Sequence, residues 1–416
     1  MTAQRWALRR VQWGTVAGAL GNGLVLPFLY AYVTGVRGLG TGTAGMMFGV
    51  LALSGLAVLP CVGWVVDGRG PRIALVAGAG SAVAGALVYA LAATLPTILA
   101  AAALLGAGTA TVQATLSTMV ACCSPPADRP RAFATQFCLT NLGLGAGGLA
   151  GGFLVDVSRP ATFTVLFGLA ILLMLALGVI AGSVTTAPPT PAERGGPGWR
   201  RVAGDRAAVR VLILGAVIFF TCYGQFESGL IALVTEMDHV SPRVVGAALT
   251  ANTVVIFCGQ LLVLRVLDGH RRSSVLALVG AVWMAAWAAL AASGLARGTT
   301  LGAAIGVISA YGLLGVGEML LAPTLGPLIV ELAPSGWLGR YSAAFTAVKQ
   351  TAVAAGPLAG GALIGARLYG PYLAALAGCT LAITGLSLHL RHHLSPAQDS
   401  LSGLRPQTEG PSPPES

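Results

Sequence analysis

The sequence predicts an all-α integral membrane protein whose twelve transmembrane helices form two pseudo-symmetric six-helix bundles. Three observations support this fold class. Hydrophobic residues make up 55% of the chain and charged residues only 9%, which excludes an ordinary soluble domain. Apolar runs long enough to cross a bilayer recur along the chain, and its two halves match each other at a constant offset.

A membrane-spanning helix needs about 20 mostly apolar residues, and we find twelve such runs. The first is longer than a signal-peptide core and has no small-residue cleavage site after it, so we expect an uncleaved span. The tenth contains Pro323 and Pro327, which remove backbone donors and predict a kink. The runs cover residues 11–34, 42–66, 73–93, 96–120, 132–155, 161–182, 210–234, 244–267, 274–293, 301–330, 342–365 and 369–390.

The basic residues predict the orientation of these spans. If the N-terminus is cytoplasmic, 18 of the 24 basic residues fall in inner segments, five in outer loops, and Lys349 within a span. Cytoplasmic loops carry an excess of Lys and Arg, so we expect both termini inside and a multi-pass location in the cytoplasmic (plasma) membrane. The net charge of +10 is spread between the spans and argues against nucleic acid as a partner.

A segment rich in Pro, Gly and Arg separates the sixth and seventh runs and is the natural linker. We assign residues 1–183 to an N-terminal six-helix half, 184–208 to a cytoplasmic linker and 209–391 to a C-terminal six-helix half. The polar tail, residues 392–416, is expected to be disordered. We expect a monomer.

The two halves match at an offset of 209 residues, which implies two parallel repeats about an axis along the membrane normal. In such folds the substrate site lies near the membrane midplane, between the halves. The matching segments are residues 106–109 with 315–318, residues 147–152 with 356–361, and Arg131 with Arg340.

The loop after the second run resembles the signature loop of the major facilitator superfamily. Gly68 and Pro71 depart from that pattern, and a degenerate second copy follows the eighth run. An Asp at a helix end among arginines can form a state-dependent latch; the alternative is an ordinary topology-setting loop. The predicted latch residues are Gly63, Asp67, Arg69, Gly70, Arg72, Asp268, Arg271 and Arg272.

The fifth and eleventh runs are similar to the glycine motif of the family's antiporters, with Gly148 in place of Pro in the fifth. Small residues of this kind let membrane helices pack closely. The predicted packing residues are Gly147, Gly151, Gly152, Gly356, Pro357, Gly360 and Gly361. The resemblance covers about residues 10–390 and favours the drug–proton antiporter-like branch, although Ala102 stands where those members usually have Arg.

Only Glu227, Glu318 and Lys349 are ionisable residues well inside the predicted spans. A charge there costs roughly 2.5–3.5 kcal/mol on insertion scales, so its default interpretation is functional. The alternative is a structural pair, such as Lys349 with Glu318. The resemblance implies that the first, fourth, seventh and tenth spans line the cavity. The proton-coupling candidates are Glu227 and Glu318, and the cavity candidates are Asn22, Tyr30, Thr109, Gln113, Tyr223, Gln225 and Lys349.

Polar amides in the eighth span have a simpler explanation. For Asn252 and Gln260 we expect a hydrogen bond to a neighbouring helix, which contributes only about 0.6 kcal/mol on average.

The predicted function is proton-coupled export of a small amphipathic or drug-like molecule by alternating access, as in a multidrug efflux antiporter. The alternatives are proton-coupled uptake of a metabolite, or a non-transporting sensor or enzyme on the same scaffold. No catalytic constellation favours an enzyme, and we expect neither a cofactor nor a metal site. The partners implied are a small-molecule substrate, protons and the lipid bilayer.

Overall fold

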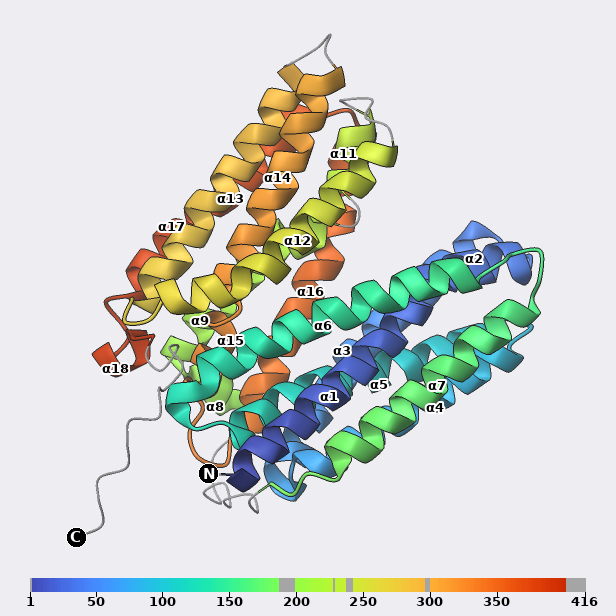
Figure 1. Ribbon diagram of the computed structural model, residues 1–416, viewed down its shortest axis with the longest axis horizontal. Helices are drawn as coiled ribbons and strands as arrows, with labels where there is room; N and C mark the ends of the chain where they lie inside the picture. The colour runs from blue at the N-terminus through green and yellow to red at the C-terminus, as the bar shows by residue number, and fades with distance from the viewer. Residues whose placement is uncertain (1, 187–198, 227–228, 237–241, 296–299, 402–416) are drawn as a thin grey trace. The chain divides into compact units, whose positions relative to one another are not determined.

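The named elements of the computed structural model are all helices, and the model describes residues 2–186, 199–226, 229–236, 242–295 and 300–401 (Figure 1). The first half contains α1 (Thr2–Val25), η1 (Leu26–Phe28), α2 (Leu29–Ala31), η2 (Tyr32–Val36), α3 (Thr41–Arg69), α4 (Pro71–Leu91), α5 (Leu95–Cys123), η3 (Pro126–Asp128), α6 (Arg129–Leu154) and α7 (Ala161–Gly182). The remainder contains α8 (Trp199–Gly204), α9 (Arg206–Thr221), α10 (Tyr223–Phe226), α11 (Gly229–Glu236), α12 (Pro242–Val266), α13 (Arg272–Leu295), α14 (Thr300–Leu321), α15 (Leu325–Leu332), α16 (Leu338–Gly365), α17 (Tyr369–Leu390) and α18 (Pro396–Asp399).

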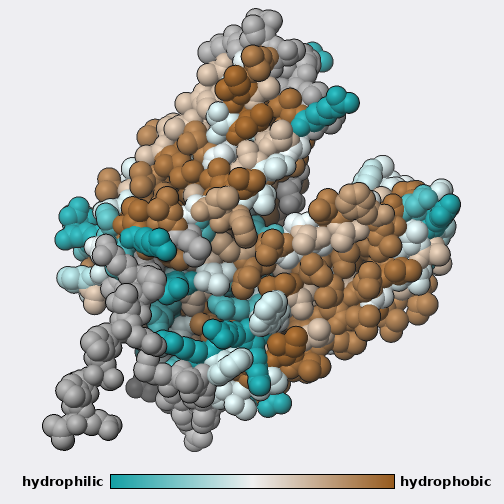
Figure 2. Space-filling model, viewed as in Figure 1, coloured by the Kyte–Doolittle hydropathy of each residue, from teal (hydrophilic) through white to brown (hydrophobic). Residues whose placement is uncertain are grey.

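Within these described ranges, eleven helical segments are long and apolar enough to cross a membrane. The remaining predicted run, residues 342–365, forms most of the 28-residue helix α16. Large apolar side chains such as Leu53, Phe153 and Val179 are exposed on these helices, and Figure 2 shows hydrophobic residues over much of the visible helix surface. Such a surface is stable against lipid and would be a liability in water.

The chain divides into two compact units. The N-terminal unit comprises Met1–Ser124, Thr135–Phe220 and Ile329–Ala355, and the C-terminal unit comprises Pro125–Ala134, Thr221–Leu328 and Gly356–Ser416. Helices α15 and α16 contribute residues to both units. We describe each unit by itself.

In the N-terminal unit, two glycines of α5 allow close approach by two other helices. A Cβ at Gly106 would collide with the Leu51 carbonyl of α3, and one at Gly108 would collide with the backbone of α4 at Ala82. Both sides of α5 therefore pack backbone to backbone, which small residues make possible in membranes.

The matching glycines of α14 have the same role in the C-terminal unit. A Cβ at Gly315 would lie 3.0 Å from Asn252 of α12, and one at Gly317 would collide with the indole of Trp283 of α13. The Trp283 indole N–H donates to the Leu314 carbonyl at 3.1 Å. The repeat seen in the sequence thus corresponds to equivalent helix packing in the two units.

The second glycine repeat packs two further helix pairs. In α6, Gly147 lies against the backbone of α1 at Leu20, and Gly151 lies against Phe28. In α16, Gly356 lies against the backbone of α10 at Gly224, and a Cβ at Gly360 would lie 3.0 Å from the Cα of Gly229. By contrast, a Cβ at Gly361 would meet nothing within 4 Å, so the motif positions differ in how tightly they pack.

The kink predicted in the tenth span is confirmed. Helix α14 ends at Leu321 and α15 begins at Leu325, with Pro323 in the turn between them. Pro323 has no N–H for the Met319 carbonyl, and Gln260 of α12 donates to that carbonyl instead, at 3.3 Å. The Thr324 hydroxyl lies within hydrogen-bonding distance of the Leu320 and Leu321 carbonyls, at 3.1 and 2.8 Å. The carbonyls near the break are thereby satisfied inside the membrane.

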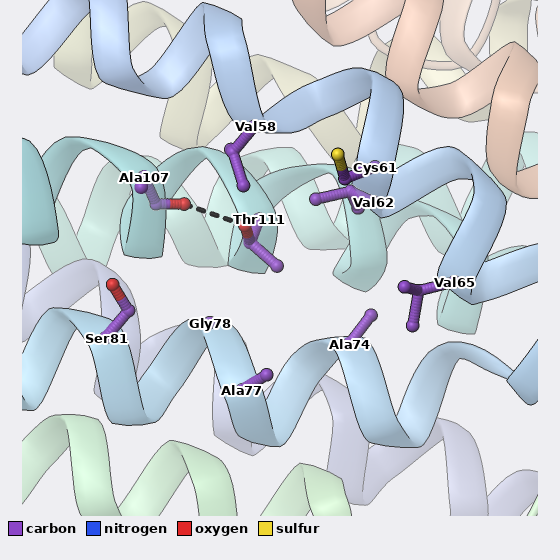
Figure 3. A pocket seen from close by; sticks show the side chains of 10 residues that line it. All are labelled: Val58, Cys61, Val62, Val65, Ala74, Ala77, Gly78, Ser81, Ala107 and Thr111. Carbon is purple, nitrogen blue, oxygen red and sulfur yellow. Dashed lines mark hydrogen bonds between the residues drawn. The ribbon is translucent and has the colours of Figure 1, made fainter.

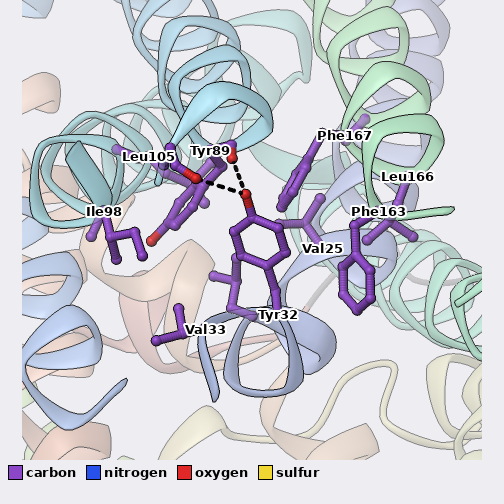
Figure 4. Packing of buried hydrophobic residues seen from close by; sticks show 14 of the residues in the cluster. Val25, Tyr32, Val33, Tyr89, Ile98, Leu105, Phe163, Leu166 and Phe167 are labelled. Atoms are coloured by element: carbon purple, nitrogen blue, oxygen red, sulfur yellow. Dashed lines mark hydrogen bonds between the residues drawn. The ribbon is translucent and has the colours of Figure 1, made fainter. Parts of the chain in front are cut away.

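An aromatic cluster fixes the irregular end of the first span. Tyr32 begins the π-helical turn η2 and packs against Tyr89, Phe163 and Phe167 (Figure 4). Its hydroxyl donates to the Tyr89 carbonyl at 2.5 Å and accepts from the Arg37 side chain at 2.8 Å. This buried cluster anchors α4 and α7 to the end of the span.

The start of the tail differs from the expected disorder. Helix α18 has a capping box formed by Ser395 and Gln398, and Leu401 is fully buried. Leu401 exchanges backbone hydrogen bonds with the loop after α12, accepting from Gly269 at 2.6 Å and donating to His270 at 2.9 Å. A capped turn and a buried leucine offset the entropy of ordering residues 392–401, and residues 402–416 lie outside the described ranges.

Candidate functional site

Glu318 lies in the C-terminal unit, near the end of α14 and three residues before the break. Glu318 is only 4% exposed. The flanking glycines bring α12 and α13 close to α14 on this turn, so the carboxylate is enclosed by neighbouring helices. A buried carboxyl group requires hydrogen-bond partners, because an unpaired one is strongly disfavoured.

Asn252 of α12 supplies one partner. Its side-chain amide donates to the Glu318 Oε1 atom at 3.0 Å and lies 3.2 Å from the Tyr311 carbonyl. Tyr223 of α10 also forms a side-chain hydrogen bond with Glu318. Asn252 does bond a neighbouring helix as expected, but its partner is the candidate proton site itself.

Gln225 occupies a second buried polar cluster in the same unit. It is fully buried on α10, and its Oε1 atom accepts a hydrogen bond from the Tyr372 hydroxyl of α17 at 2.9 Å. Phe226 stacks edge-on against Tyr311, with ring centroids 5.1 Å apart. The unit therefore holds an aromatic and amide cluster on α10, α17 and α14, the helix that also carries Glu318.

The remaining proton-coupling and cavity candidates lie outside the described residues or in the N-terminal unit. Glu227 lies outside the described residues. In the N-terminal unit, Asn22 is partly buried on α1, Tyr30 is 48% exposed on α2, and Gln113 is exposed on an otherwise largely buried part of α5. The Thr109 hydroxyl is satisfied locally, by the Leu105 carbonyl at 2.9 Å.

Lys349 is part of the N-terminal unit, where its ammonium lies 5.5 Å from the ring centroid of Phe219. Phe219 in turn packs against Phe345 with centroids 5.5 Å apart. A cation over an aromatic face is an attractive contact when it is shielded from water. Because Glu318 belongs to the other unit, the pairing of Lys349 with Glu318 stays a prediction.

The signature loop engages the first turn of α16 within the N-terminal unit. The Asp67 carboxylate accepts from the backbone N–H groups of Gly339 at 2.6 Å and Arg340 at 3.2 Å. It also pairs with the Arg340 guanidinium at 3.1 Å, with the Asp67 side chain 4% exposed. An acceptor at a helix N-terminus satisfies orphan donors and complements the helix dipole. Asp67 thus caps a helix more than 270 residues away in sequence.

Close approach and linker contacts surround this pair. A Cβ at Gly63 would lie 2.9 Å from the Arg340 Cα, and Gly70 adopts φ +91°, which favours glycine at the turn into α4. Arg69 is exposed, with its guanidinium 5.5 Å from the Trp64 ring centroid, and Arg72 is exposed on α4. Among the described residues, Arg340 is the ion-pair partner of Asp67.

The linker helix α8 contacts residues that neighbour the Asp67–Arg340 pair. Trp199 approaches Gly63, and Arg201 stacks over Trp337, which Arg340 also contacts, at 5.2 and 4.5 Å from the ring centroid. Just after α8, Asp205 caps α9 and accepts a 2.6 Å hydrogen bond from Tyr341 of α16. The described end of the predicted linker is therefore part of the N-terminal unit.

The second copy of the loop has a different partner. At its end, Ser273 donates to the Asp399 carboxylate through both its backbone N–H and its hydroxyl, each at 2.8 Å. Arg271 pairs with Ser400 in an isolated bridge, and Arg272 is 2% exposed. Asp268 is also an interacting residue. The tail thus caps α13 in the C-terminal unit.

Sequence reasoning did not identify Tyr311 and Tyr372 as neighbours of the candidate site. An aromatic residue in an apolar span gives no signal of a polar role, because it packs equally well in a core. Arg340 did have a signal, since it matches Arg131 in the repeat, but its partner was not predictable from spacing.

Comparison with known proteins agrees with this architecture. Residues 13–357 match the sequence model of the Major Facilitator Superfamily. No curated protein matches the chain. The chain is structurally similar to the E. coli fucose:proton symporter FucP, with a TM-score of 0.73, 13% identity, and coverage of 93% of this chain and 98% of that one. It is also similar to the human organic anion transporter MFSD10 (TETRAN), with a TM-score of 0.63, 14% identity, and coverage of 94% and 99%.

These two similarities in structure bear on the fold alone, because both identities are low. The fold class predicted from the sequence is confirmed, and the membrane-spanning helices make this a multi-pass membrane protein. Members of the matched family are transporters of small molecules, not enzymes. Since the family match covers most of the chain, the protein belongs to the Major Facilitator Superfamily.

Proposed function

We propose that the protein exports a small amphipathic or drug-like molecule in exchange for protons, by alternating access. The observation that carries the proposal is the buried Glu318 carboxylate, held by Asn252 on a glycine-lined turn of a membrane helix. Its repeat counterpart is Thr109, so the scaffold itself does not require a carboxylate there. An intramembrane acid of this kind is a functional site by default.

Protonation would change the hydrogen bonds around Glu318. The ionised carboxylate only accepts hydrogen bonds, which suits the Asn252 amide and the Tyr223 hydroxyl. The protonated acid carries a donor and must find an acceptor. Proton binding therefore alters the contacts between α14, α12 and α10, and a cationic or polar substrate would compete for the ionised form. In this mechanism Glu227 is a second candidate for the same role.

The Asp67–Arg340 pair is the proposed latch of one access state. Opening that side would separate α3 from the first turn of α16 and expose both charges to water. We place this latch, both termini and the linker on the cytoplasmic side of the plasma membrane, because the basic residues concentrate there. We further propose a monomer with two halves, residues 1–183 and 209–391.

One observation favours uptake by proton symport as a second candidate. Ala102, which stands where drug–proton antiporters of the family usually have Arg, is fully buried in the α5 core beside Tyr32 and Tyr89. One structurally similar protein is a fucose:proton symporter, and for this reason a sugar is included among the probes below.

Replacing Glu318 with Gln tests the proposal, since Gln keeps an acceptor for Asn252 but cannot exchange a proton at neutral pH. We expect the variant to insert normally and to lose pH-driven flux in proteoliposomes. Ethidium, fucose and fluorescein serve as cationic, sugar and anionic probes, and pyranine reports proton movement. Asp156→Asn, which removes an exposed loop carboxylate, is the matched control.

The direction of the imposed gradient separates the two candidates. Export predicts probe movement opposite to the proton gradient, and uptake predicts movement along it. Unchanged pH-driven flux in the Glu318→Gln variant would show that Glu318 does not couple transport to protons.

A further inference from the structure

A cavity of about 190 Å³ opens on the N-terminal unit between α3, α4 and α5 (Figure 3). Val58, Cys61 and Val65 line it from α3, and Ala74, Ala77 and Ser81 line it from α4. Gly78 and Thr111 form its floor, where a Cβ on Gly78 would lie 2.8 Å from the Thr111 side chain. Cys61 and Ala77 are exposed on spanning helices, so the cavity is a groove open to the membrane.

The groove is suited to hydrocarbon. Its two side-chain hydroxyls already donate to backbone carbonyls, Ser81 to Leu104 and Thr111 to Ala107, at 2.8 and 2.7 Å. No ionisable residue other than Cys61 lines it, so a polar ligand would find few partners. An apolar chain gives up no hydrogen bonds by entering such a groove, and it makes dispersion contacts with the groove walls.

Positive charge lies at one end of this groove. Arg69 ends α3 and Arg72 lies in the first turn of α4, and both are exposed. The one acidic residue of the two helices, Asp67, is buried and paired with Arg340. Trp64, which is 55% exposed and lies beside Arg69, has the amphipathic ring that favours the membrane interface. This end therefore complements an anionic headgroup.

The spacing fits a phospholipid. Along α3, Arg69 is about 6 Å from Val65 and about 16 Å from Val58, at roughly 1.5 Å per residue. Along α4, Arg72 is about 3 Å from Ala74 and about 14 Å from Ser81 on the same rise. One leaflet of a bilayer has about 15 Å of hydrocarbon. With the arginines at headgroup depth, the groove covers the depth of one acyl chain.

We propose that this groove binds an anionic phospholipid, with one acyl chain between α3 and α4 and the phosphate at Arg69 and Arg72. The site shares no residue with the Glu318 cluster, and its headgroup end adjoins the Asp67–Arg340 pair of the proposed latch. Its occupant is part of the membrane, and its specificity comes from the two arginines.

Native mass spectrometry of the full chain tests the site, after equilibration in micelles with equal amounts of phosphatidylglycerol and phosphatidylcholine of identical chains. We expect the wild type to retain phosphatidylglycerol preferentially. The Arg69→Gln/Arg72→Gln variant should lose about fivefold in that preference per arginine, the factor equivalent to ~1 kcal/mol per basic residue at an anionic surface. The matched control, Arg265→Gln/Arg391→Gln, removes two exposed arginines elsewhere and should keep it.

A second pair of variants tests the groove itself. Ala77→Phe fills the groove and should lower retention of both lipids, whereas Ala57→Phe, at an exposed α3 position outside the lining, should not. Gel filtration establishes that each variant is folded. Equal retention of the two lipids by the wild type, equal losses in both arginine pairs, or full retention by Ala77→Phe would each overturn the proposal.

Discussion

At the scale of single residues, two buried amides in this protein each supply a hydrogen-bond donor that a neighbouring helix lacks. Pro323 leaves the Met319 carbonyl without its helical donor, and Gln260 replaces that donor from another helix. Asn252 likewise serves a carboxylate that the lipid environment would otherwise leave unpaired. These polar side chains of a membrane helix thus lie where a neighbouring helix has a buried acceptor that needs a hydrogen-bond donor.

Gln260→Leu should therefore destabilise the protein by about 1 kcal/mol, which lies between the average of about 0.6 and the maximum of about 1.7 kcal/mol for hydrogen bonds between membrane helices. In a Pro323→Ala background the new N–H can reach Met319, so the loss of Gln260 should cost less. A double-mutant cycle measured by unfolding in mixed micelles gives the coupling free energy. Strict additivity of the two changes would show that Gln260 does not compensate for Pro323.

At the scale of helices, the glycine repeats determine which helix pairs lie closest. Gly106 and Gly108 bring α3 and α4 onto α5, and Gly315 and Gly317 bring α12 and α13 onto α14. The same helix turn that needs small residues for packing carries Glu318, so packing and the candidate chemistry are linked in the C-terminal unit. Close packing restricts motion there, and any change in the hydrogen bonds of Glu318 must be taken up by these neighbours.

Two glycines of α6 that are two residues apart should respond to Ala with opposite changes in stability. Gly147→Ala introduces a methyl group against the α1 backbone and should cost about 1–3 kcal/mol, the usual penalty for overpacking. Gly145 faces open space, so Gly145→Ala should stabilise the helix by about 0.5–1 kcal/mol. Thermal unfolding of the two variants checks this difference. A stabilised Gly147→Ala variant would contradict the assigned α1–α6 packing.

At the scale of the whole molecule, two carboxylates cap helices that are distant from them in the sequence. Asp67 caps α16 in the N-terminal unit, and Asp399 of the tail caps α13 in the C-terminal unit. The first contact is an ion pair between α3 and α16, and the linker helix α8 contacts residues beside it, so three remote segments of the chain meet there. Breaking one partner of a buried ion pair costs about 3–5 kcal/mol.

Asp67→Asn should loosen the contact between α3 and α16, since the amide cannot match the Arg340 charge. Spin labels at Gly68→Cys and Ser335→Cys, both exposed sites of the N-terminal unit, report the distance between these segments in a background lacking the native cysteines. We expect the distribution of distances between the two labels, measured by electron paramagnetic resonance, to broaden and to shift to longer distances than in the parent. Asp128→Asn, an exposed acid elsewhere, should leave them unchanged. Identical distributions in the Asp67→Asn variant and the parent would refute a latch.

The sequence by itself determined the spans, the repeat and the position of the buried carboxylate. Those features depend on local properties: a run must match the bilayer thickness, and a charge inside it is costly wherever it points. The break at Pro323 was equally local, because proline removes a donor in any context.

Only the tertiary structure decided the partners. Asn252 and Glu318 are 66 residues apart, and Asp67 and Arg340 are 273 apart, so their pairing depends on which helices pack and in which rotation. The ordered start of the tail depended on the surface that receives it, since a polar segment of low hydrophobicity is stable only where Leu401 and Asp399 find a buried site. Spacing along the chain carries no information about such contacts.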